Sequence, residues 1–194
     1  KKGFADLNLV FKNGTLKKIN NILINYDDNE FKSDFDFQQN NFLKISNINS
    51  KNFIAKSILV HKENDKLNVK IDGKLVDISH LTNDLIDQKK IKDIDVKFDI
   101  VSNKIILNNK FSLSGNLTGS YKNKIFSSLA KGKIILGSNT LLDAGQLNIL
   151  VENGKYLITG KGSLNSGKTK VKIISSSGGL PKVTFESQEG GKLL

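Results

Sequence analysis

Apolar and polar residues alternate with a period of two through most of the chain. In one such stretch Leu67, Val69 and Ile71 alternate with Asn68 and Lys70. Residues two apart lie on the same face of a β-strand, so this pattern predicts a strand with one apolar and one solvated face. Nearly every other segment repeats the pattern and then ends in a polar turn, which predicts a chain made mostly of strands.

Short polar turns between the alternating runs indicate hairpins. The strongest signal is Asn13-Gly14, because Asn-Gly between two alternating runs favours a tight β-turn. The expected helices are few and short: Ser79 is a suitable N-cap residue, Thr82–Lys92 is the best helical segment, and Gln188–Leu194 is a second. The sequence predicts an all-β fold, a long twisted antiparallel sheet in meander order with one or two short helices.

The length of 194 residues fits one large all-β unit or two small ones. We expect a single unit over residues 1–194, with sub-repeats 1–81 and 93–194 as its natural division. Because the chain starts without Met and shows no stop signal at its end, we expect it to be an excerpt of a longer protein.

Two glycines stand among apolar residues on one predicted strand. Gly115 and Gly119 are in phase with Phe111, Leu113 and Leu117. They either leave room on the apolar face for something bulky or let the sheet bend there.

Lysine dominates the charged residues, and the formal net charge is +11. This excess either attracts anionic partners, such as nucleic acid or anionic lipid, or only solvates the outside of the sheet. Nucleic acid is not among the expected partners, because the aromatic signature of RNA-binding sheets is missing; binding of a single strand is kept as a minor alternative.

Motifs for catalysis or metal binding are weak. Residues Gly162–Thr169 fit the phosphate-loop pattern G-x4-G-K-[ST], but the residues after them alternate as a strand where that loop needs a helix. The segment is therefore interpreted as a hairpin turn. The chain has no Cys, and its two histidines, His61 and His80, form no metal site alone. We expect that the chain is not an enzyme and that it binds no cofactor and no metal.

Three stretches together resemble a known family. Val10–Leu16 leads to Leu43–Ile48, Val69–Ser79 is similar to a recurrent strand-Gly-strand segment that ends in Asp-Leu-Ser, and Phe185–Leu194 is similar to a recurrent closing segment. In these stretches the chain resembles the central region of the AsmA-like proteins of Gram-negative bacteria, relatives of YhdP and TamB, in an alphaproteobacterial form.

This resemblance implies an open β-groove with an apolar concave face. It implies a periplasmic protein anchored in the inner membrane through regions outside this chain, and transport of phospholipid between the two membranes. It supplies no catalytic residues. With the alternation above, it predicts that acyl chains contact these side chains: Phe35, Phe37, Val69, Ile71, Val96, Phe98, Phe111, Leu113, Leu117, Leu147, Ile149 and Ile158.

A second hypothesis explains the same alternation. In a structural or adhesive β-scaffold, a sandwich or solenoid, the apolar face is ordinary core and holds no lipid. The two hypotheses differ in whether the apolar face is open or covered by protein.

Overall fold

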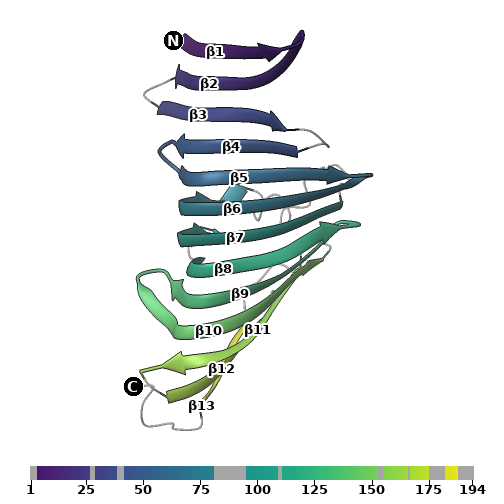
Figure 1. The fold of residues 1–194 in the computed structure, drawn as a ribbon. Coiled ribbons are helices and arrows are strands. Elements are labelled where there is room, and N and C mark those ends of the chain that lie inside the picture. Colours follow the sequence, from purple (N-terminus) through teal and green to yellow (C-terminus); the bar gives the residue numbers. More distant parts are fainter. Residues whose placement is uncertain are drawn as a thin grey trace.

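The computed structural model describes residues 4–26, 29–38, 42–80, 95–108, 111–152, 155–165, 167–174 and 182–187. They form one open sheet of thirteen strands, which confirms the predicted all-β class (Figure 1). The strands are β1 (Phe4–Lys12), β2 (Thr15–Tyr26), β3 (Asn29–Gln38), β4 (Phe42–Asn49), β5 (Phe53–Glu63), β6 (Lys66–Asp77), β7 (Asp95–Ile106), β8 (Phe111–Lys122), β9 (Ile125–Leu136), β10 (Asn139–Glu152), β11 (Lys155–Leu164), β12 (Gly167–Ile174) and β13 (Lys182–Ser187).

Strands adjacent in sequence are adjacent in the sheet from β1 to β13, as in a meander. All pairings are antiparallel except that of β6 with β7, which is parallel. A parallel pair needs a connection long enough to cross back along the strands, and residues 78–94 provide it. The expectation of a wholly antiparallel sheet was therefore wrong at this one step.

The connection after β6 begins as a helical turn. Ser79 and His80 are helical, and the backbone N–H of Ser79 donates to the Asp77 carboxylate at 2.9 Å. The expected helices Thr82–Lys92 and Gln188–Leu194 lie outside the described residues.

The first hairpin has the predicted Asn-Gly turn. Asn13 has a φ of 50° and Gly14 a φ of 72°, so both residues adopt the left-handed conformation that a two-residue type I′ turn requires. Asn123 and Lys124 make the same turn between β8 and β9, with φ of 51° and 63°. These turns fix the register of the strands that they join.

The register places apolar residues in continuous rows across the sheet. One row, the central row, passes through every strand by direct cross-strand pairing. It consists of Leu9, Ile19, Phe35, Ile45, Ile58, Ile71, Ile100, Leu117, Ala130, Leu147, Gly160, Val171 and Phe185. We call the face that bears this row the inner face and the opposite one the outer face.

Beside the central row, small residues line up on the same inner face. This small-residue row crosses β5 to β13 and includes four glycines that pair in succession. It consists of Ala55, Gly73, Ser102, Gly115, Gly132, Gly145, Gly162, Thr169 and Ser187. Backbones can approach closely along such a row, and glycine lets the strands bend there.

One carboxylate on the outer face braces two irregularities near the N-terminal end. Asn21 on β2 and Asn47 on β4 have positive φ, 54° and 56°, and lie at breaks in the register on either side of β3. Asp34 on β3 accepts the backbone N–H of Asn21 at 2.8 Å and the side-chain amide of Asn47 at 3.0 Å. Asp34 thereby supplies hydrogen-bond partners that the ladder lacks at these bulges.

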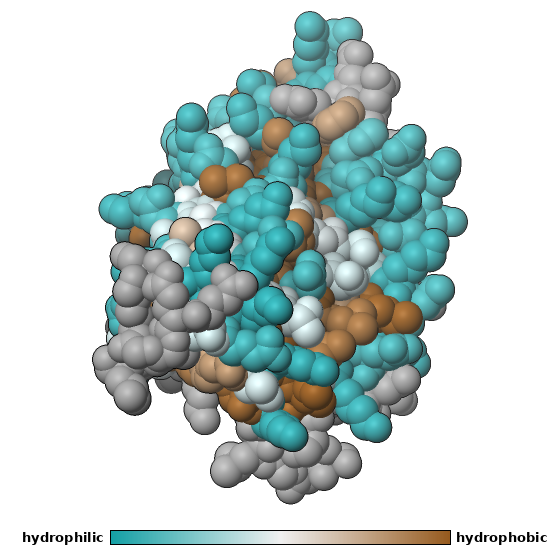
Figure 2. Space-filling model, turned by 90° about the horizontal axis from the view of Figure 1, so that it is seen from below, coloured by the Kyte–Doolittle hydropathy of each residue, from teal (hydrophilic) through white to brown (hydrophobic). Residues whose placement is uncertain are grey.

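The inner face differs between the two ends of the sheet. Strands β6 to β12 supply a cluster of buried apolar side chains that pack together, whereas several apolar side chains of β1 to β3, among them Leu9, Phe11 and Phe37, stay exposed. Figure 1 shows the strands twisting and curling most strongly toward β11, β12 and β13. Viewed from that end, hydrophobic residues form a central band with hydrophilic residues on both sides (Figure 2).

Candidate functional site

All twelve side chains predicted to contact acyl chains lie on the inner face. Phe35, Ile71, Leu117 and Leu147 belong to the central row itself. A neighbouring row, two residues further along each strand, contains the next five: Phe37, Val69, Phe98, Ile149 and Ile158. Val96, Phe111 and Leu113 lie on β7 and β8 at positions that share this face.

The inner face is an open apolar surface at the N-terminal end of the sheet. Leu9 is 50% exposed, Phe11 59% and Phe37 36%, although all three are in phase with the central row or its neighbours. Exposed apolar side chains that adjoin one another form a contiguous patch, which is the usual mark of an interaction surface. This part of the face is accessible to a ligand.

The same face is closed over β8 to β12, whereas Val183 and Phe185 on β13 are 40% and 44% exposed. Leu113, Leu117 and Leu147 are at most 1% exposed, and Ile149 and Ile158 are also buried. These side chains belong to the cluster built by β6 to β12, in which they pack against one another. A ligand can reach them only if this end of the sheet opens.

An aromatic side chain occupies the space beside Gly119. A Cβ atom placed on Gly119 would lie 2.6 Å from Cζ of Phe98, the residue that pairs with it on β7. Phe98 also stacks on Phe126, with ring centroids 5.4 Å apart. The missing side chain of Gly119 does leave room on the inner face, but the Phe98 ring occupies that room. The space beside Gly119 is therefore not vacant for a ligand.

Few polar groups interrupt the inner face. Ser33 lies between Phe31 and Phe35, and its hydroxyl donates to the backbone carbonyl of Ser46 at 3.1 Å. The hydroxyl of Ser128 is buried and has no hydrogen-bond partner among the described residues. A buried polar atom without a partner costs free energy, so a polar ligand group would be favoured beside Ser128.

The phosphate-loop pattern lies in a hairpin, as predicted. Its residues span the end of β11 and the start of β12, where Leu164 pairs with Gly167. The turn residue Asn165 has a φ of 49°, and its backbone N–H donates to the Asp143 carboxylate at 3.1 Å. A strand follows the loop, so no helix N-terminus faces a phosphate there.

Among the described residues, neither histidine belongs to a group of three side chains that could bind a metal ion. His61 stacks on Phe42, with ring centroids 4.0 Å apart and an interplanar angle of 4°. Across the described ranges, no three His, Cys, Asp or Glu side chains are grouped so that they could hold a metal ion.

The prediction from sequence omitted several residues that belong to the same surface. Ile45, Ile58 and Ile100 lie in the central row between predicted members. Their alternation was visible in the sequence, but only the register shows that they join Phe35 to Leu117 without a break. The apolar surface is thus more continuous than the predicted set suggested.

No helix in the described part of the chain is long and apolar enough to cross a membrane. Comparison with known proteins adds no assignment to this geometry: no family model, no curated protein and no solved structure matches the chain.

Proposed function

We propose that the inner face of the sheet holds lipid acyl chains. The observation that supports this most is the central row, which stays apolar or small through all thirteen strands and is exposed at the N-terminal end. In this proposal the chain is a segment of a longer AsmA-like protein. That protein is anchored in the inner membrane, spans the periplasm and conducts phospholipid between the two membranes of a Gram-negative cell.

The dimensions and energetics of the sheet suit such a role. Thirteen strands have twelve gaps of ~4.8 Å, so the face extends roughly 58 Å along the sheet. Burial of an acyl chain of about 16 carbons gains on the order of 12 kcal/mol before entropic costs, at ~0.8 kcal/mol for each CH₂. The open end at β1 to β4 is where a lipid would first contact the face.

In this proposal the twelve side chains predicted to contact acyl chains have a binding role only. They are hydrocarbon groups without a nucleophile or base, so lipid would pass along them unchanged, without a cofactor or metal. Nucleic acid is not among the expected partners of this face.

A structural scaffold is the second candidate function, and one observation favours it. The near-complete burial of Leu113, Leu117 and Leu147 is typical of protein core. In that case the C-terminal half of the sheet is a closed support, and the exposed apolar patch at β1 to β3 is a docking surface for protein.

Lipid bound to the purified chain distinguishes the two candidates. The chain is expressed in a Gram-negative host, purified without detergent and analysed by native mass spectrometry, with an apolar fluorescent dye as a second probe. We expect phospholipid adducts and dye binding to the folded protein. A chain that carries no lipid and binds dye only when unfolded would contradict lipid binding and favour the scaffold.

A further inference from the structure

The outer face has a hollow at the C-terminal end of the sheet, on the side opposite the candidate lipid-binding face. Its volume is about 620 Å³, and it spans β9 to β13. Backbone of Gly132, Gly145 and Gly162 contributes to its floor, because these glycines put no side chain on either face. Side chains that alternate with this row, from Gln146, Lys161, Lys168, Lys170 and Glu186, belong to the outer face and surround it.

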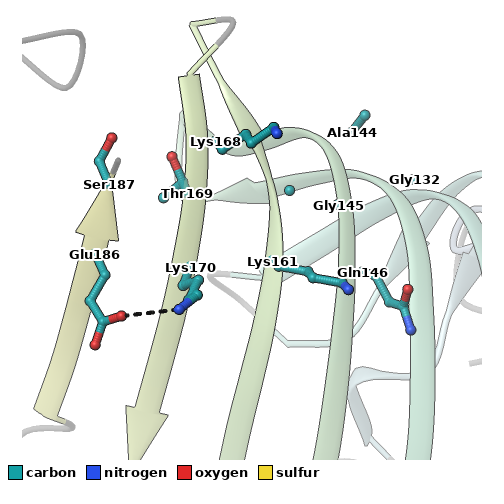
Figure 3. Close-up of a pocket in the computed structure, with 11 residues that line it drawn as sticks. Gly132, Ala144, Gly145, Gln146, Lys161, Lys168, Thr169, Lys170, Glu186 and Ser187 are labelled. Atoms are coloured by element: carbon teal, nitrogen blue, oxygen red, sulfur yellow. Dashed lines mark ion pairs between the residues drawn. The ribbon is translucent and has the colours of Figure 1, made fainter. Parts of the chain in front are cut away.

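Lysine dominates the charge around this hollow. Three lysines and one glutamate line it, which leaves a net charge of +2 (three minus one). Gln146, Lys161, Lys170 and Glu186 follow one another by direct pairing across four strands, and Figure 3 shows Lys161 beside Gln146 next to the Lys170–Glu186 ion pair. That ion pair is 3.6 Å long and both side chains are 70% exposed, so it neutralises Lys170 only weakly.

An exposed apolar row accompanies the lysines on the same face. Leu150, Leu157 and Ile174 pair across β10, β11 and β12, and each is more than a third exposed. Leu150 is four residues along β10 from Gln146, which places the apolar row roughly 13 Å from the hollow. Lysines beside exposed aliphatic side chains are the combination by which proteins bind the surface of an anionic membrane.

We propose that the outer face of β9 to β13 binds the surface of an anionic phospholipid membrane. Lys161, Lys168 and Lys170 bind phosphate groups of the lipid headgroups at the hollow, and Leu150, Leu157 and Ile174 contact the apolar boundary beneath them. This contact is separate from acyl-chain binding, because it uses the opposite face of the sheet. It accounts for part of the net charge of +11.

A membrane fits this surface better than a nucleic acid does. Proteins that bind single strands combine lysine or arginine with aromatic side chains on which bases stack. The apolar residues beside this hollow are aliphatic, which suits a lipid interface. Lipid headgroups and free phosphate both present anionic oxygens to lysine, so inorganic phosphate serves as a separate probe.

The test compares two triple variants that remove the same charge. The first variant, the hollow triple, removes the lysines of the hollow: Lys161→Gln/Lys168→Gln/Lys170→Gln. The second variant, the control triple, removes three exposed lysines of β6 and β7: Lys74→Gln/Lys97→Gln/Lys104→Gln. Binding is measured by sedimentation with vesicles of phosphatidylcholine with and without phosphatidylglycerol, at low and high salt. Inorganic phosphate and a single-stranded oligonucleotide are titrated in parallel.

We expect the hollow triple to weaken binding to anionic vesicles by about a hundredfold at low salt, since each lysine near an anionic surface contributes roughly fivefold. The control triple should have a much smaller effect. Raising the salt should weaken binding of the unaltered chain steeply, because the Debye length falls from about 10 Å at 0.1 M to 3 Å at 1 M. Leu150→Asn/Leu157→Asn should weaken vesicle binding and leave any effect of inorganic phosphate unchanged.

Equal losses in the two triples would overturn the proposal, because the charge would then act without a defined site. Equal binding to neutral and anionic vesicles would also overturn it. The same holds if inorganic phosphate or the oligonucleotide binds through these lysines while vesicles do not bind. The melting temperature of each variant is measured first. If the triple melts lower than the parent chain, the single variants Lys161→Gln and Lys97→Gln replace the two triples.

Discussion

Gly115 on β8 pairs directly with Gly132 on β9, and both have a positive φ, 148° and 136°. A Cβ atom on Gly115 would overlap the backbone carbonyl oxygen of Lys131, and one on Gly132 would overlap that of Ser114. The two backbones therefore approach at a point where only glycine fits. This pair lies at the centre of the small-residue row, where the sheet turns from its open end to its curled end.

Gly115→Ala should destabilise the fold by about 2–3 kcal/mol, because it adds both backbone strain and overlap with a neighbouring strand. Gly137→Ala is the control: Gly137 also has a positive φ, 62°, but no atom lies within 4 Å of its added Cβ. The control should cost only about 1 kcal/mol. Urea denaturation measures the free energy of unfolding of both variants. Equal losses of stability would show that β8 and β9 do not approach closely at Gly115.

Asp34→Ala should lower stability by about 1–2 kcal/mol, because it removes the acceptor for two donors at adjacent bulges, Asn21 and Asn47. Asp36→Ala on the same strand and face removes only the exposed ion pair with Lys18, 3.1 Å long, and should cost at most about 0.5 kcal/mol. Thermal unfolding of the two variants checks this order. A larger loss for Asp36→Ala would contradict the bracing role of Asp34.

Leu117→Asp should unfold the domain, since an unpaired charge at a fully buried position costs several kcal/mol. Ser120→Asp on the same strand faces outward beside Lys97 and should leave stability nearly unchanged. Asn116 is less suitable as the control, because its side-chain amide donates to Asp99 at 2.8 Å. Circular dichroism with temperature is the measurement, and a folded Leu117→Asp would mean that the curled end opens readily.

Val69→Asp should reduce bound lipid about tenfold while the chain stays folded, because Val69 is only half-buried on the inner face. Asn68→Asp is the matched control on the outer face, where it pairs with Lys97. Lipid content per protein is measured by mass spectrometry. Similar lipid content in the two variants would exclude Val69 from the binding surface.

The period of two predicted well which face each residue takes. It placed Phe35, Val69 and Leu117 on one face, and the register of the sheet agrees. It did so because a strand alternates its side chains whatever its neighbours are. Polar turn residues between alternating runs, also a local signal, predicted the Asn13-Gly14 hairpin and the hairpin at Asn165.

Other features depend on neighbours that a single strand does not reveal. Leu117 is buried and Phe37 exposed because the sheet curls toward one end, and the close approach of Gly115 to Gly132 appears only when two strands are paired. The sequence did not predict the parallel pairing of β6 with β7, because a connection of this length is compatible with either direction of the second strand. The lysine-lined hollow was missed because Lys161 and Lys170 become neighbours only through the pairing of β11 with β12.

Photo-crosslinking from two phenylalanine positions shows whether lipid lies on the inner face. Phe37 on β3 is 36% exposed on the inner face, and Phe42 on β4 is 37% exposed on the outer face, where its ring stacks on His61. The two positions are therefore similarly exposed but lie on opposite faces. A photoreactive phenylalanine analogue is placed at either position in the chain expressed in a Gram-negative host, and lipid adducts are identified by mass spectrometry after irradiation. We expect phospholipid adducts from position 37 and few from position 42. Equal labelling from both positions, or none from position 37, would contradict lipid binding on the inner face.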